Sequence, residues 1–252
     1  MSKRRKLSTF FSVRTIAPNA VTLLAFCAGL TSIRFALDDR WELALSSILV
    51  AGVLDGLDGT VARLLRSTSK FGAELDSLSD VVAFGVVPAF IVYMWSLDSL
   101  GRLGWAVSLI FAMAMILRLA RFNSRLEDES EPRKKMGYLT GIPAPMAAGL
   151  AIAPIIMDVG YTGTITQQYP YILAGYILGI SILMISTLPT FSFKFIKIPR
   201  DNFVPMMLTI GIIFAGLYVY TWGLLLLIAV AYLISIPWCY VTYRRALKRG
   251  DF

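Results

Sequence analysis

The residues with the greatest capacity for chemistry are four aspartates in an otherwise apolar stretch of the chain. Asp55 and Asp58 are three residues apart, and Asp76 and Asp80 are four residues apart. In a helix these spacings place both members of a pair on one face, with about 5 to 6 Å between their Cβ atoms. Two such helices facing each other would form a pocket lined by four carboxylates.

Carboxylate oxygens are the ligands that Mg²⁺, Mn²⁺ and Ca²⁺ prefer. The chain has no histidine, and its cysteines, Cys27 and Cys239, are far apart in the sequence, so a transition-metal site is not indicated. Four carboxylates can hold two cations about 3.5 to 4 Å apart, a pair that binds a pyrophosphate. A bare charge in a membrane costs roughly 2.5 to 3.5 kcal/mol. We therefore predict two divalent cations, Mg²⁺ or Mn²⁺, with Ca²⁺ as an alternative.

Small residues accompany the aspartates at Gly56, Gly59, Ala62 and Gly72. They remove side chains where a bulky ligand would approach helix backbone. Close packing of membrane helices is the alternative explanation for these small residues. Arg63, at the end of the first group, offers a planar fork of donors for a phosphate or a base edge.

Composition indicates an integral membrane protein, because 57% of the 252 residues are hydrophobic and several runs approach the roughly 20 apolar residues of a spanning helix. The predicted fold class is therefore all-α, with about eight transmembrane helices. Their predicted ranges are 18–37, 41–65, 71–97, 103–123, 141–158, 170–188, 203–220 and 222–243.

The basic residues predict the orientation of these helices. Of the 24 Lys and Arg, only Arg40 and Arg102 fall on one side, and Arg34 falls inside the first predicted helix. The others lie on the side of both termini, which is cytoplasmic by the positive-inside rule. This distribution explains the net charge of +8 without nucleic-acid binding. It also places both aspartate pairs in the cytoplasmic third of the membrane.

The residues from Asp55 to Asp80 follow the pattern D-x2-D-G-x2-A-R-x8-G-x3-D-x3-D at every fixed position. This pattern resembles the signature of the CDP-alcohol phosphotransferase family. The resemblance implies a core of six transmembrane helices, here residues 18–188. It also implies a homodimer, a CDP-linked lipid substrate and two divalent cations. Residues 1–17 would then be a cytoplasmic tail and interfacial helix, and 189–252 two additional helices with a basic tail.

The resemblance also implies roles for individual residues. The metal ligands would be Asp55, Asp58, Asp76 and Asp80, and Asp80 would also be the general base. Pro18-Asn19-Ala20-Val21-Thr22 is similar to the family's Pro-Asn-x-x-Thr element. The residues expected to bind CDP-diacylglycerol are Asn19, Thr22, Gly59, Ala62, Arg63 and Ser69.

Two further segments, 118–123 and 141–145, resemble elements of the family members that use serine, the CDP-diacylglycerol–serine O-phosphatidyltransferases. Arg118 and Arg121 share a helix face and could bind the serine carboxylate. They could equally anchor the helix at the cytoplasmic interface. Asn123 could bind the serine ammonium group or end the helix.

The predicted activity is transfer of the phosphatidyl group from CDP-diacylglycerol to the hydroxyl of L-serine, giving phosphatidylserine and CMP at the inner membrane. The same chemistry with choline, glycerol 3-phosphate or an inositol phosphate as acceptor is an alternative. A cation or proton transporter that uses the intramembrane acids is an alternative of a different class.

Overall fold

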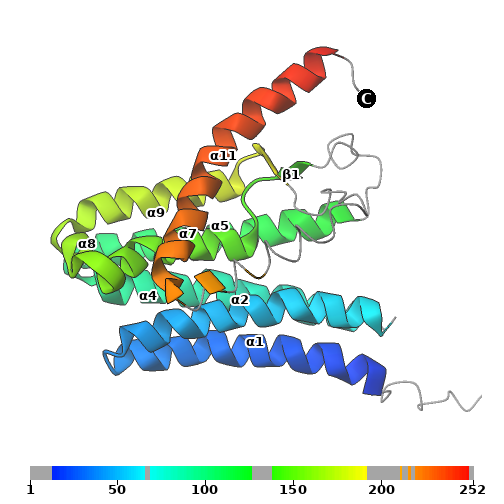
Figure 1. Ribbon diagram of the computed structural model, residues 1–252, viewed down its shortest axis with the longest axis horizontal. Coiled ribbons are helices and arrows are strands. Elements are labelled where there is room, and N and C mark those ends of the chain that lie inside the picture. Colours follow the sequence, from blue (N-terminus) through cyan, green and yellow to red (C-terminus); the bar gives the residue numbers. More distant parts are fainter. Residues whose placement is uncertain are drawn as a thin grey trace, which may run out of the picture. The chain divides into compact units, whose positions relative to one another are not determined.

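The computed structural model describes residues 13–65, 69–126, 138–191, 211, 215–216 and 219–249. Nearly all of these residues are helical. The chain divides into two compact units, Met1–Ile91 and Val92–Phe252. The helices are labelled in Figure 1.

The first unit consists of consecutive helical segments: α1 (Val13–Leu37), α2 (Trp41–Leu64), α3 (Lys70–Asp80), the π-helical turn η2 (Val81–Val86) and the beginning of α4 (Val87–Trp95). α1 and α2 lie side by side and antiparallel (Figure 1). The turn between them passes through Asp39, whose φ of 56° is left-handed and tolerated by aspartate. The Arg40 N–H donates to the Phe35 carbonyl at 2.8 Å and closes the turn.

Small residues allow the helices of this unit to approach closely. Ala44 and Ala51 of α2 are fully buried. A Cβ added to Gly29 of α1 would lie 3.2 Å from Ala83 of η2, a spacing that favours glycine. In η2, the Val87 N–H donates to the carbonyl of Val82, five residues earlier instead of four. The helix that carries Asp76 and Asp80 is therefore wider directly after Asp80.

The second unit contains the end of α4 and a longer series of elements. They are η3 (Leu97–Leu100), α5 (Arg102–Leu126), β1 (Tyr138–Thr140), α7 (Ala144–Met157), η4 (Asp158–Thr162), α8 (Ile165–Gln168), α9 (Pro170–Ile185), β2 (Pro189–Phe191) and α11 (Thr221–Arg249).

The core of the second unit lies around α7, where Leu150, Ile152 and Ile155 are buried. α5 packs along α9, and α11 contacts α7 and β2. β1 and β2 form a short antiparallel pair, with Leu139 opposite Thr190. This pair joins the chain after α5 to the chain after α9.

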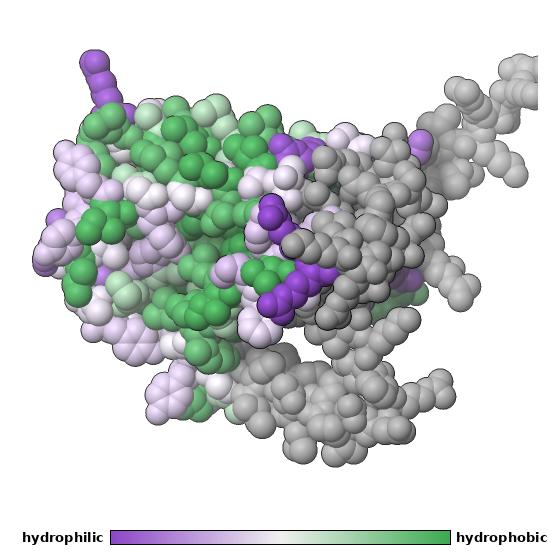
Figure 2. Space-filling model, turned by 90° about the horizontal axis from the view of Figure 1, so that it is seen from above, coloured by the Kyte–Doolittle hydropathy of each residue, from purple (hydrophilic) through white to green (hydrophobic). Residues whose placement is uncertain are grey.

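Within the part of the chain that the structure describes, six helices are long and apolar enough to cross a membrane. They cover Ile16–Leu37, Trp41–Leu64, Lys70–Trp95, Arg102–Ser124, Ala144–Thr162 and Thr221–Arg245. α9 is equally apolar but shorter, at 16 residues. Large apolar side chains remain exposed on these helices, among them Leu57, Ile116 and Trp238, and much of the surface in Figure 2 is apolar. A surface of this kind fits lipid, and the all-α membrane class is confirmed.

The structure also differs from the sequence-based prediction in detail. The strand pair and the two π-helical turns were not predicted, and α9 ends at Ile185 because Ser186 has extended backbone angles. The predicted span 203–220 lies mostly outside the described residues. So do residues 1–12 of the N-terminal tail and residues 127–137 of the loop after α5. These assignments, and the division between a core and two additional helices, stay predictions.

Candidate active site in the first unit

Three carboxylates come together where α2 meets α3. Asp55 of α2 and Asp76 and Asp80 of α3 each have a carboxylate oxygen within 4.8 Å of the others. Among the residues whose side chains the structure describes, no lysine or arginine forms an ion pair with these three; the pair that is present joins Arg34 to Asp38. Charges so close together require a cation or protons between them.

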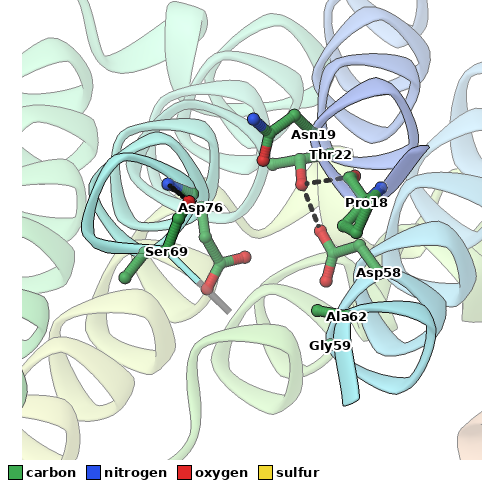
Figure 3. Close-up of a pocket in the computed structure, with 10 residues that line it drawn as sticks. Pro18, Asn19, Thr22, Asp58, Gly59, Ala62, Ser69 and Asp76 are labelled. Carbon is green, nitrogen blue, oxygen red and sulfur yellow. Dashed lines mark hydrogen bonds between the residues drawn. The ribbon is translucent and has the colours of Figure 1, made fainter. Parts of the chain in front are cut away.

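Asp58 occupies a different environment from the other three aspartates. It is buried, with 6% of its surface exposed, and its Oδ2 accepts a hydrogen bond from Thr22 Oγ1 of α1 at 2.7 Å. Figure 3 shows the Asp58 and Asp76 carboxylates on opposite sides of a pocket, with Thr22 beside Asp58. The sequence predicted one unit of four ligands. The structure brings three together and sets Asp58 at the pocket wall, so its metal-binding role stays a prediction.

The pocket is formed by the start of α1, the last turns of α2 and the first turns of α3. Its lining residues are Pro18, Asn19, Thr22, Asp58, Gly59, Ala62, Ser69, Gly72, Ala73 and Asp76. Five of the six residues expected to bind CDP-diacylglycerol are in this list, and Arg63 is not. Pro18 and Ala73 were not predicted. Pro18 stands at the start of the Pro-Asn-x-x-Thr element, which was the available signal for it.

Glycine is needed at the two glycine positions of the pocket for different physical reasons. A Cβ added to Gly59 would meet no atom within 4 Å, so this glycine borders open space. A Cβ added to Gly72 would lie 3.0 Å from Asn19 Oδ1 and 3.1 Å from Ser69 Oγ. Gly72 therefore allows α3 to pack against α1. Gly59 fits the predicted close approach of a ligand to the backbone.

Arg63 and Ser69 make local contacts at the edge of the pocket. The Arg63 Nε donates to the Gly59 carbonyl at 3.0 Å, so its exposed side chain lies along its own helix. Ser69 is the N-cap of α3, and its Oγ accepts from the Gly72 N–H at 3.0 Å. An N-cap of this kind stabilises a helix start by about 1 kcal/mol.

Ser79 is a buried polar residue that the sequence analysis overlooked. It has 6% of its surface exposed, and its Oγ donates to the backbone carbonyl of Thr22 at 3.3 Å. The sequence marks Ser79 only by its position between Asp76 and Asp80. A serine at such a position has no distinctive pattern, so its role could not be predicted.

The residues predicted to bind the acceptor belong to the second unit. Arg118, Arg121 and Asn123 all lie on α5. The Arg121 Nη1 donates to the backbone carbonyl of Ile185, at the C-terminal end of α9. This carbonyl is one of the helix-end groups that have no partner within the helix. Arg121 is thus engaged in joining α5 to α9.

Comparison with known proteins shows the family to which the chain belongs. The profile of the CDP-alcohol phosphatidyltransferase family matches residues 15–188. This match covers well over half of the chain, so the chain belongs to that family and is a membrane-bound phosphatidyltransferase. The matched region contains all four aspartates and the whole pocket.

Several curated relatives are similar over most of the chain. The CDP-diacylglycerol–serine O-phosphatidyltransferase of Mycobacterium tuberculosis (strain ATCC 25618 / H37Rv) is 36% identical over 222 residues, which are 88% of this chain and 77% of the relative. The protein of the same name from Helicobacter pylori (strain J99) is 36% identical over 197 residues, 78% of this chain and 81% of the relative. The archaetidylserine synthase of Methanothermobacter thermautotrophicus is 30% identical over 191 residues, 75% of this chain and 73% of the relative.

Proposed function

We propose that this protein transfers the phosphatidyl group from CDP-diacylglycerol to the hydroxyl of L-serine, giving phosphatidylserine and CMP. The observation that carries the proposal is the cluster of Asp55, Asp76 and Asp80 beside a pocket lined by the family's nucleotide-binding residues. Serine as acceptor is supported by the relatives' names. The bacterial and archaeal names differ in the lipid but share serine.

The carboxylate cluster fits two divalent cations, Mg²⁺ or Mn²⁺, with Ca²⁺ as an alternative. The donors are oxygens only, they lie close together, and no described basic side chain neutralises them. Asp55, Asp76 and Asp80 would hold the cations together with Asp58. When bound, the cations would neutralise the charge that develops on the pyrophosphate during phosphoryl transfer.

The pocket beside the cluster is the proposed site of the CDP group. Gly59 and Ala62 leave the α2 backbone open to it, and Asn19 and Ser69 present polar side chains from the other side. Arg63 would reach a phosphate or the base by leaving its contact with the Gly59 carbonyl. The nucleotide would thus be held mainly by backbone and short side chains.

In the reaction, the serine hydroxyl oxygen forms a bond to the phosphorus that carries the diacylglycerol. The bond from this phosphorus to the oxygen of CMP breaks, and CMP leaves with its electron pair. Asp80 takes the proton of the serine hydroxyl. Of the two α3 aspartates in the cluster, Asp80 is the one outside the pocket lining, which leaves it available to an acceptor.

Acceptor recognition falls to α5 in this proposal. A serine carboxylate needs a cationic partner, and Arg118 and Arg121 are one helical turn apart. Arg121 donates to the Ile185 carbonyl and would have to leave this contact to bind the carboxylate, and both arginines stay candidates. Asn123 would accept from the serine ammonium group.

The enzyme is further proposed to be a homodimer with both termini and the active site on the cytoplasmic side. The support for this orientation is the distribution of Lys and Arg, of which only Arg40 and Arg102 fall on the opposite side. A cytoplasmic site would give soluble serine direct access to a lipid-linked substrate.

The test is an acceptor screen with the full-length protein purified in detergent. CDP-diacylglycerol and Mn²⁺ or Mg²⁺ are supplied with serine, choline, glycerol 3-phosphate or an inositol phosphate in turn, and CMP release and the lipid product are measured. The Asp76→Asn variant is the matched inactive control. Of the four acceptors, we expect only serine to give CMP release. Release with another acceptor but not with serine would contradict the proposal.

A further inference from the structure

Thr22 is the residue that joins α1 to both helices that carry the aspartates. It is buried, with 4% of its surface exposed. Its Oγ1 lies 2.7 Å from Asp58 Oδ2 and 3.1 Å from the Pro18 carbonyl. A hydroxyl has one proton, and the shorter contact to a carboxylate is the stronger hydrogen bond. The Thr22 hydroxyl therefore donates to Asp58 of α2.

The backbone of the same residue is connected to α3. The Thr22 carbonyl accepts from Ser79 Oγ at 3.3 Å, and Ser79 lies between Asp76 and Asp80. A carbonyl has two lone pairs, so it can accept from Ser79 in addition to a bond within its own helix. Both contacts are buried, so water does not compete strongly with them. Thr22 thus contacts α2 with its side chain and α3 with its backbone.

The side-chain contact holds one of the two carboxylates that face each other across the pocket. One oxygen of Asp58 is occupied by Thr22, which leaves Oδ1 for the pocket. Asp76 faces Asp58 from the other side of the pocket (Figure 3). A side chain that fixes a metal-binding residue in this way typically changes metal affinity by about 10- to 100-fold when it is removed.

We propose that Thr22 is a positioning residue that sets the orientation of Asp58 and, with Ser79, the separation between Asp58 and the α3 carboxylates. This inference rests on the proposed function only in assuming that the carboxylates bind divalent cations. It assigns to Thr22 a role different from the expected direct contact with CDP. The two roles predict opposite effects on metal and nucleotide binding.

The experiment measures Mn²⁺ binding to the purified full-length protein without CDP-diacylglycerol or serine, by the loss of the free Mn²⁺ electron paramagnetic resonance signal. Thr22→Val keeps the side-chain shape and removes the hydroxyl, so we expect the Mn²⁺ Kd to rise about 10- to 100-fold. Thr22→Ser keeps the hydroxyl and should stay within about threefold of wild type. Ser79→Ala, which removes one uncharged hydrogen bond, should raise the Kd by roughly two- to tenfold.

The matched control is Thr31→Val on the same helix. Thr31 Oγ1 donates only to the Cys27 carbonyl of its own helix among the described residues, at 2.6 Å, so its loss should leave Mn²⁺ binding unchanged. A double-mutant cycle adds a second test, because Thr22→Val should have no further effect on the Mn²⁺ Kd once Asp58→Asn has removed the carboxylate. This cycle compares folded proteins through their Mn²⁺ affinity, so it separates positioning from general damage.

The binding of CDP at saturating Mn²⁺ distinguishes the two roles of Thr22. Positioning predicts that Thr22→Val leaves the CDP Kd near the wild-type value. An unchanged Mn²⁺ Kd together with weaker CDP binding would overturn the proposal in favour of direct nucleotide contact. Equal damage by Thr22→Ser and Thr22→Val would also overturn it. None of these outcomes depends on serine, so failure of the acceptor screen would leave them intact.

Discussion

Two groups of carboxylates lie within the membrane-spanning helices, and they differ in what surrounds them. Asp158, at the start of η4 in the second unit, is 1% exposed. It accepts hydrogen bonds from Trp95 Nε1 at 3.3 Å, from Thr162 Oγ1 at 2.8 Å and from the Thr166 N–H at 2.8 Å. Thr166 Oγ1 donates to it as well. The protein itself supplies donors for both carboxylate oxygens.

Asp55, Asp76 and Asp80 of the first unit have one another as neighbours instead. The difference shows how to separate two kinds of intramembrane acid. A carboxylate surrounded by donors from its own chain holds elements together, here α4, η4 and α8. Carboxylates that face other carboxylates need a cation or protons between them, and the need for a cation is the property of a metal-binding site. The following predictions test this distinction.

Removal of divalent cations should have the largest effect. Treatment of the wild-type enzyme with EDTA should lower CMP release by roughly a thousandfold or more, because metal-ion stabilisation of the transition state is worth several kcal/mol. Added Mn²⁺ should restore activity. Mn²⁺ at 100 times its Kd should also stabilise the folded protein by about 2.7 kcal/mol, seen as a higher Tm. Near-normal activity in EDTA would mean that the reaction does not require cations bound by the carboxylate cluster.

Asp80→Asn should lower kcat by about 10² to 10⁴, the usual contribution of a general base. The Tm should stay at or above the wild-type value, because the substitution removes one of three charges that repel one another. CMP release and thermal melting in detergent give the two readings. Loss of stability together with activity would instead indicate that Asp80 has a structural role like that of Asp158.

The same distinction can be tested on the two arginines of α5. Arg121 donates to the Ile185 carbonyl, so Arg121→Gln should lower the Tm. Arg118→Gln should raise the KM for serine by roughly ten- to a hundredfold, since a charge-assisted hydrogen bond contributes about 1.5 to 3 kcal/mol. Titrations of serine and, separately, of CDP-diacylglycerol measure the change in KM. An unchanged serine KM in both variants would move acceptor recognition away from these arginines.

Asp158→Asn should lower the free energy of unfolding by about 1 to 3 kcal/mol, because the amide cannot accept from all of the donors around it. The Mn²⁺ affinity should not change. Asp98→Asn is the matched control: Asp98 is exposed and accepts from the Tyr93 hydroxyl at 2.9 Å, so its loss should cost about 0.5 kcal/mol or less. If Asp158→Asn kept full stability but lost activity, the structural role assigned to Asp158 would be wrong.

Gly59→Leu should raise the KM for CDP-diacylglycerol by about tenfold, because the new side chain would occupy the open space beside the α2 backbone. Gly175→Leu on α9 provides the control, since a Cβ there also meets no atom within 4 Å. The control should change neither KM nor the amount of folded protein. Equal kinetics in both variants would mean that the open space at Gly59 does not receive the substrate.

Much of the fold and part of the site could be predicted from the sequence, because both depend on patterns local to the chain. Long apolar runs fix the spanning helices, and the three- and four-residue spacings place each aspartate pair on one helix face. Asn19, Gly59 and Ser69 were predicted through the family pattern and line the pocket.

The contacts that could not be predicted join residues far apart in the chain. Thr22 to Asp58, Arg121 to Ile185, and Trp95 to Asp158 each depend on how two elements pack. No periodicity encodes such a contact. For the same reason, the spacing alone could not show that Asp58 accepts from Thr22 while the other three aspartates cluster. The strand pair of β1 and β2 is too short to leave a pattern of alternating residues.

The π-helical turn η2 has a consequence for which mutations the enzyme can tolerate. The turn contains one residue more than an α-helical path would need between Asp80 and α4. Deleting a single residue from Val81–Val86 would let the helix continue in regular form. Because the turn takes up that extra residue, Asp76 and Asp80 would keep nearly the same orientation relative to the residues after Val86, among them Val87, which lies beside Gly29. Loss of one residue from Val81–Val86 is therefore expected to be tolerated better than loss of one from a regular helical turn of α3, which would turn the side chains on its two sides by about 100° relative to one another.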